Sequence, residues 1–110
     1  MFDMMKMMGK VKEVQEKMKI AQEELISIKS EGESGGGLVK AIANGKKQII
    51  QLDIDPSLFK EEDQEILKDL IVAAVNKAIL EADEKAKAHL QQATQGILPN
   101  IPGMDFSGLG

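Results

Sequence analysis

The sequence of 110 residues predicts one domain of the α+β class, in which two long helices flank a small antiparallel sheet. Three observations lead to this prediction. Apolar residues recur every seven positions in the first quarter of the chain, glycines and an Asn-Gly pair divide the middle, and a long amphipathic segment follows. We expect the domain to occupy residues 1–96. Residues 97–110 are rich in Pro and Gly and are expected to form a flexible tail.

The first expected helix covers about residues 4–28. Its apolar residues form two sets with a period of seven, which is the spacing of a narrow seam that packs against another helix. Methionine also suits promiscuous grooves and membrane surfaces, but charges of both signs flank the seam and favour a core or dimer contact. The two sets are Met4, Val11, Met18 and Leu25, and Met7, Val14, Ala21 and Ile28.

Strands are expected on both sides of Asn44-Gly45, because a tight hairpin turn needs residues that tolerate positive φ. Residues 28–34 are a candidate third strand that leads into the glycines of 35–37. A two-residue turn would pair Ala43 with Lys46, Ala41 with Gln48 and Val39 with Ile50. The expected core side of the hairpin then holds Val39, Ala41, Ile50, Leu52 and Ile54.

The second helix is expected over about residues 62–95, with Gly96 as its stop. Before it, Asp55 can cap a short turn that begins at Pro56. After Leu80 the apolar face thins to alanines and Leu90, so we expect the last turns to project. The expected buried face consists of Ile66, Leu67, Leu70, Ile71, Ala74, Val75, Ala78, Ile79 and Ala82.

Helix length predicts a second copy of the chain. A helix of about 25 residues is roughly 38 Å long, whereas a strand of about 8 residues spans roughly 26 Å. The sheet therefore cannot cover the whole first helix, and the seam begins at Met4 in the overhanging end. An exposed apolar stripe there favours a symmetric homodimer. The alternative is that the second helix of the same chain covers the entire seam.

Signals for catalysis are weak. The absence of cysteine excludes disulfides, thiol catalysis and Cys-based metal sites. The single histidine, His89, lies among polar residues near a helix end, and Asp53 and Asp55 fit a strand end with a cap better than a metal site. Gly32 and Gly37 have the spacing of a phosphate-binding loop, but apolar residues replace its Lys-Ser/Thr. We expect no enzyme activity, cofactor, metal or small-molecule substrate.

Lysine distribution is more informative than the net charge of −4. The 14 basic residues are all lysines, and residues 1–19 hold five of them against three acids. Two helix segments expected to overhang the sheet are therefore basic, and a dimer would relate them by a two-fold axis, like duplex DNA. The lysines of these segments are Lys6, Lys10, Lys12, Lys17, Lys19, Lys85 and Lys87.

The N-terminal residues do not form a secretory signal, since Asp3 and Lys6 interrupt the apolar stretch. The longest wholly apolar run, residues 70–75, is far shorter than the roughly 20 residues that span a bilayer. We therefore expect a cytoplasmic protein without membrane contact.

Four short motifs, in this order and spacing, resemble the YbaB/EbfC family of bacterial nucleoid-associated proteins. They follow a leading helix rich in Met and Lys and cover nearly the whole chain. The motifs are Gly32-Glu-Ser-Gly-Gly-Gly-Leu-Val-Lys40, Asn44-Gly45, Asp53-Ile-Asp-Pro-Ser-Leu58 and Asp69-Leu-Ile-Val-Ala-Ala-Val-Asn76.

The resemblance implies an α-β-β-β-α protomer with a three-stranded antiparallel meander, and a homodimer whose projecting helices grip double-stranded DNA in the nucleoid. It implies chromosome organisation and modulation of transcription. The lysines named above are then the candidate DNA contacts. Arginine, the commonest bidentate reader of guanine, is absent, so we expect contacts to backbone phosphates and low sequence specificity. The alternative is a protein-interaction module that assists recombination or replication without binding DNA.

Overall fold

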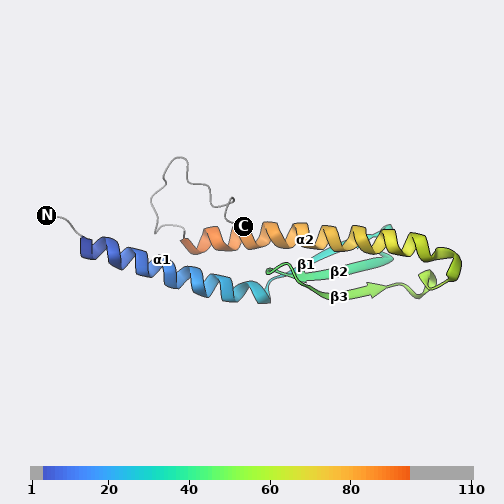
Figure 1. Cartoon of the computed structure of the whole chain (residues 1–110), viewed down its shortest axis with the longest axis horizontal. Coiled ribbons are helices and arrows are strands. Elements are labelled where there is room, and N and C mark those ends of the chain that lie inside the picture. The colour runs from blue at the N-terminus through green and yellow to red at the C-terminus, as the bar shows by residue number, and fades with distance from the viewer. Residues whose placement is uncertain (1–3, 95–110) are drawn as a thin grey trace.

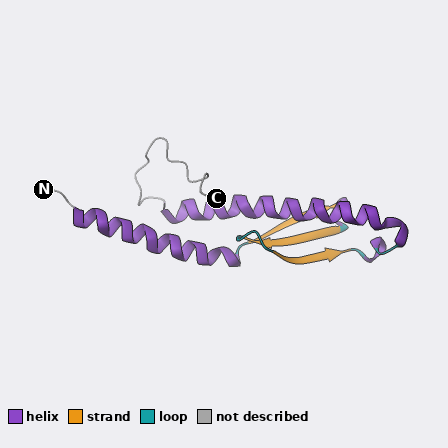
Figure 2. Ribbon diagram, viewed as in Figure 1, coloured by secondary structure: helices purple, strands orange, loops and turns teal. Residues whose placement is uncertain are grey.

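Long helices and a small antiparallel sheet form an elongated α+β structure (Figures 1 and 2). The computed structural model describes residues 4–94. It measures 75 × 25 × 15 Å, and its radius of gyration is 19.8 Å. A compact chain of this length would have a radius of gyration of about 13 Å. The excess arises from two helices that continue past one end of a small sheet.

The elements follow the predicted order. Helix α1 (Met4–Glu24) ends in a 3₁₀ turn, and strands β1 (Lys29–Ser34), β2 (Val39–Asn44) and β3 (Ile49–Ile54) form an antiparallel meander in the order β1-β2-β3. Helix α2 (Gln64–Thr94) follows a capped 3₁₀ turn and packs across β1 and β2 (Figure 1). The predicted third strand is confirmed. The expected helix stop at Gly96 and the tail of residues 97–110 lie outside the described residues.

Small side chains hold α2 close to the sheet. The inward residues of β1 are Ser30, Gly32 and Ser34, and a Cβ at Gly32 would overlap the main chain of α2. This proximity is possible because the facing residues of α2 are alanines. The core consists of Val39, Ala41, Ala43, Leu58, Ala74, Ala78 and Ala82. Ile66, expected in the buried face, is exposed, because it lies on another side of α2 from these alanines.

The predicted hairpin register is wrong by three residues beside the turn and by four residues beyond it. Val39 pairs with Ile54 rather than with Ile50, and the pairing is irregular between Ile42 and Ala43. Asn44 explains the longer loop, because its side-chain oxygen accepts hydrogen bonds from the main-chain N–H groups of Lys46 (2.9 Å) and Gln48 (3.2 Å). Beyond the irregularity the slip of four is even, so Val39 and Ala41 still share a face with Leu52 and Ile54, whereas beside the turn Ala43 pairs with Ile49.

The two helices form one arm beyond the sheet. They run antiparallel, and the second half of the α1 seam packs on the late turns of α2 (Figure 1). Ala21 of α1, Leu25 of the 3₁₀ turn that follows it, and Ala82 and Ala86 of α2 are buried. The late alanines of α2 are therefore a packing face, and both helices project side by side rather than as separate rods.

The first half of the α1 seam has no cover from the described chain. Met7 and Val11 remain 65% and 56% exposed, while Val14 and Met18 are half-buried. The alternative in which α2 covers the entire seam is therefore wrong for residues 4–94. This uncovered segment is the overhang that the length of the helices predicted.

Candidate nucleic-acid interface

The five candidate lysines of α1 are all exposed, and they fall in two rows. Lys6, Lys10 and Lys17 recur along one side of the helix, while Lys12 and Lys19 recur along another side, roughly 150° around the axis. A straight helix therefore presents only one row at a time to a rigid rod such as duplex DNA. Only Lys17 has an ion-pair partner within residues 4–94, namely Glu13 at 3.6 Å.

The two candidate lysines of α2 also lie on different sides. Lys85 donates a hydrogen bond to the Lys29 carbonyl oxygen of β1 (2.8 Å) and pairs with Glu81 (3.3 Å). Lys87 lies two residues further, which is more than half a turn of helix, and pairs with Asp83 (3.1 Å). Both residues sit where the arm leaves the sheet, so the structure places them at the base of the arm rather than at its tip.

A contact between the helices defines the two flanks of the arm. Glu24 of α1 lies 3.2 Å from Nε2 of His89 on α2. Lys10, Lys17 and Glu24 are seven residues apart and share one side of α1, and Lys85 lies one turn before His89. We call this side, with Lys6, Lys10, Lys17, Glu24, Lys85 and His89, the His89 flank. The opposite side, with Lys12, Lys19, Asp83 and Lys87, is the Asp83 flank.

Sequence reasoning missed Lys47 at the base of the arm. Its Nζ lies 3.0 Å from Oδ1 of Asp83, so the turn between β2 and β3 is joined to α2. The hydrogen bond from Lys47, followed by that from Lys87, lowers the pKa of the Asp83 carboxyl below its ordinary value of 3.8. Lys47 is also the one non-glycine residue of the described chain with positive φ, at 63°. Only its position after the Asn-Gly pair hinted at this role.

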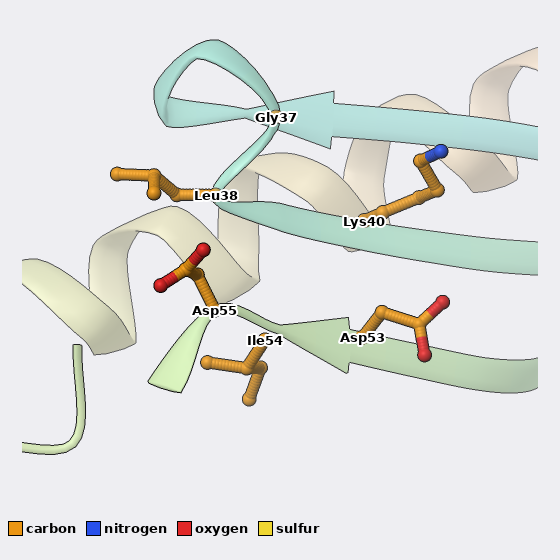
Figure 3. A pocket seen from close by; sticks show the side chains of 6 residues that line it. All are labelled: Gly37, Leu38, Lys40, Asp53, Ile54 and Asp55. Atoms are coloured by element: carbon orange, nitrogen blue, oxygen red, sulfur yellow. The ribbon is translucent and has the colours of Figure 1, made fainter. Parts of the chain in front are cut away.

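Of the two carboxylates considered for metal binding, Asp55 has a structural role. Oδ1 of Asp55 accepts a hydrogen bond from the N–H of Ser57 (2.9 Å), as a cap of the Pro56–Leu58 turn, and this bond lowers the pKa of Asp55. Asp53 and Asp55 line a shallow hollow of about 280 Å³ at the sheet end, where their carboxylates point in different directions (Figure 3). Within residues 4–94 no three acidic or histidine side chains converge as a metal site.

The glycines that suggested a phosphate loop serve the fold. Gly32 permits the close contact with α2, and Gly35, Gly36 and Gly37 have positive φ values of 62°, 67° and 95° in the turn between β1 and β2. That turn connects β1 to β2. A phosphate-binding loop instead leads into the N-terminus of an α-helix, whose N–H groups bind the phosphate. Of the helices described, none has the length and apolarity that a bilayer crossing requires.

The described chain is thus an elongated α+β scaffold that carries exposed lysines along a projecting two-helix arm. The sequence profile of the YbaB/EbfC DNA-binding family matches residues 1–97. The chain belongs to the YbaB/EbfC family of nucleoid-associated DNA-binding proteins, which is not a family of enzymes.

Relatives of the chain are found in several bacteria. The chain is 51% identical over 104 residues to a nucleoid-associated protein of Agrobacterium fabrum, covering 94% of this chain and 96% of the relative. It is 41% identical over 103 residues to a nucleoid-associated protein of Caldanaerobacter subterraneus, covering 94% and 91%. A crystal structure of an uncharacterized protein from Helicobacter pylori superposes with a TM-score of 0.68 at 25% identity, covering 80% of this chain and 92% of that one.

Proposed function

We propose that this protein binds double-stranded DNA as a homodimer, mainly through backbone phosphates and with low sequence specificity. In this role it helps to organise the bacterial chromosome and modulates transcription. The proposal includes a location in the cytoplasm, at the nucleoid, since the relatives are named nucleoid-associated proteins. Residues 1–96 are the proposed binding domain, and residues 97–110 are a tail that DNA binding does not need.

The exposed lysines of the α1 overhang carry this proposal. Lys6, Lys10 and Lys12 lie in the first half of α1. The N-terminal turns of α1 extend past the described end of α2 and away from the sheet (Figure 1), so a duplex can approach there without meeting the sheet. Lysine acts on phosphate as a point charge and reads no base pattern by itself. Binding through such contacts releases counterions, so affinity depends steeply on salt.

The uncovered β3 strand supports the homodimer. It is an edge strand, and α2 packs over β1 and β2 but hardly reaches it (Figure 2). Ile50 and Leu52, on its inner side, are 49% and 40% exposed. An exposed apolar edge strand makes a monomer prone to aggregation. In a homodimer with a two-fold axis, the β3 strands of the two protomers would cover each other.

A protein-docking role is the second candidate, and the exposed seam favours it. Met7 and Val11 of the seam, with Met8 beside them, form an exposed apolar stripe on α1. Methionine-rich surfaces adapt to varied partners. In that case the arm would bind a component of the recombination or replication machinery. The lysines would then serve only to keep the surface of the arm soluble.

A duplex-binding experiment separates the two functions. Fluorescence anisotropy with a random-sequence duplex at low and moderate salt would compare the wild type with the Lys10→Glu/Lys12→Glu variant. The matched control is Lys60→Glu/Lys68→Glu, which makes the same change of net charge at the other end of the molecule. Sedimentation at the same concentrations would report whether each variant keeps the oligomeric state of the wild type.

We expect the arm variant to lose at least about tenfold in affinity and the control to lose about twofold or less. Equal losses would mean that net charge alone matters, which contradicts binding through the arm. No binding of the wild type at low salt would favour the docking function.

A further inference from the structure

Two ammonium groups at the base of the arm hold opposite oxygens of one anion. Nζ of Lys47 lies 3.0 Å from Oδ1 of Asp83, and Nζ of Lys87 lies 3.1 Å from Oδ2. The two cations thus converge on a single small group with two equivalent oxygens. A DNA phosphate presents such a pair in its non-bridging oxygens, so the geometry that holds the carboxylate also suits a phosphate.

The turn that carries Lys47 is fixed before any ligand arrives. Asn44 is buried, and its amide Nδ2 donates to Oε1 of Gln48 (2.8 Å) while its Oδ1 accepts from the main chain. The N–H of Gly45 donates to the Leu25 carbonyl oxygen (2.8 Å), which ties the turn to the junction of α1 and β1. Lys47 itself has a left-handed backbone, which a side chain adopts at a cost only where its surroundings demand it.

The space around these cations is open. A hollow of about 410 Å³ lies between the turn and α2, lined by Lys47, Asn76, Ile79, Leu80, Asp83 and Lys87. The same flank of the arm carries Lys12 and Lys19 on α1. A duplex lying along the Asp83 flank would therefore meet lysines along α1 and again at the base of the arm.

We propose that Lys47 and Lys87 form a phosphate-binding site for duplex DNA at the base of the arm, and that Asp83 occupies this site in the free protein. The inference rests on the DNA-binding function proposed above. It adds Lys47 to the DNA contacts and makes Asp83 a competitor of the DNA phosphate. The backbone phosphate displaces the Asp83 carboxylate and takes over its two ammonium partners. No covalent step is involved.

Asp83 is an effective competitor because it stays ionised. Hydrogen bonds from the two lysines hold its pKa below 3.8, so it is a full anion at neutral pH. Its side chain is 25% exposed, which leaves it a path to swing away from the site. DNA binding at the base of the arm is consequently weaker than the two lysines alone would make it.

The test compares two variants with the same change of net charge. Asp83→Asn removes the competitor, whereas Glu84→Gln, on the next residue of α2, neutralises an acid that makes no ion pair within residues 4–94. Anisotropy with a random-sequence duplex would measure the affinity of both full-length variants at several salt concentrations. Lys47→Gln and Lys47→Arg complete the set, and urea unfolding reports stability.

We expect Asp83→Asn to bind the duplex about fivefold more tightly than Glu84→Gln, as expected when two exposed ion pairs no longer compete. Lys47→Gln should lower the steepness of the salt dependence by about one unit per protomer, and Lys47→Arg should restore it. If the ion pairs of Asp83 with Lys47 and Lys87 only stabilised the fold, Asp83→Asn would lower both the stability of the protein and its affinity for DNA.

An affinity of Asp83→Asn within twofold of Glu84→Gln would overturn the phosphate site while leaving the DNA-binding function intact. A wild type that binds no duplex at low salt would overturn both.

Discussion

Gly32 of β1 lies directly against the main chain of Ala74 on α2, so closely that a Cβ on Gly32 would overlap the Ala74 carbonyl oxygen. This contact sets the distance between the sheet and the long helix. Two residues further along β1, the hydroxyl of Ser34 donates a hydrogen bond to the Leu70 carbonyl oxygen (2.5 Å). The Gly-Glu-Ser segment at residues 32–34 is therefore a docking surface for α2.

Gly32→Ala should destabilise the protein by about 1–3 kcal/mol, because α2 would have to move away from β1. The matched control is Gly9→Ala on α1, where an added Cβ meets nothing within 4 Å. That variant should gain about 0.5–1 kcal/mol from better helix propensity. Urea unfolding of both variants measures the difference, and an unchanged stability of Gly32→Ala would contradict the close packing.

The two serines of β1 give a second matched pair. Ser30 is buried and its Oγ has no hydrogen-bond partner in the described chain, whereas Ser34 bonds to α2. Ser30→Ala should therefore leave stability unchanged or raise it by up to about 1 kcal/mol, and Ser34→Ala should lower it by about 1 kcal/mol. If thermal or urea unfolding showed equal losses of stability for the two variants, the two hydroxyls would have the same surroundings, which would contradict the structure.

Acid should weaken the link between the β2–β3 turn and α2. The Lys47 and Lys87 hydrogen bonds lower the pKa of Asp83 in the folded state below its ordinary value of 3.8. The contribution of Asp83 to stability is then complete above pH 3.8 and disappears as the pH falls through the folded pKa. The difference in unfolding free energy between wild type and Asp83→Asn should shrink below that pH. An NMR titration of the Asp83 carboxyl with a midpoint at or above 3.8 would contradict this.

Much of this fold could be predicted from local patterns. The heptad of α1, the Gly-rich turn and the Asp55 cap each act within a few residues, so the sequence contains their cause. The hairpin register could not be predicted in the same way. It depends on the buried side chain of Asn44, which closes the loop, and on an irregularity at Ile42/Ala43 that no residue type announces.

The site was harder to predict than the fold, because it depends on sides of helices and on distant partners. Lys85 and Lys87 are only two residues apart, but they face opposite flanks of the arm. The composition of a segment does not reveal this difference, because it arises from the rotation of about 100° per residue in an α-helix. Lys47 could not be found from the sequence, because its partner Asp83 is brought to it only by the packing of α2 on the sheet.

Disrupting the β3 face should separate the protomers. Leu52→Asp would place a charge on the uncovered inner side of β3, and we expect it to shift a dimer to a monomer in sedimentation at micromolar concentration. Ile26→Asp, at an exposed position in the turn after α1, is the control and should sediment as the wild type does. A dimeric Leu52→Asp variant would mean that the copies meet through another surface.

The salt dependence of duplex binding tests the central claim most directly. If about six lysines of a dimer contact phosphates, the logarithm of the association constant should fall with the logarithm of salt concentration with a slope near −5. Anisotropy titrations of the wild-type protein with a random-sequence duplex, across a tenfold range of potassium chloride, measure this slope. A steep slope of that size is the predicted result, and binding that is flat with salt, or no binding at all, would contradict contact through the lysines of the arm.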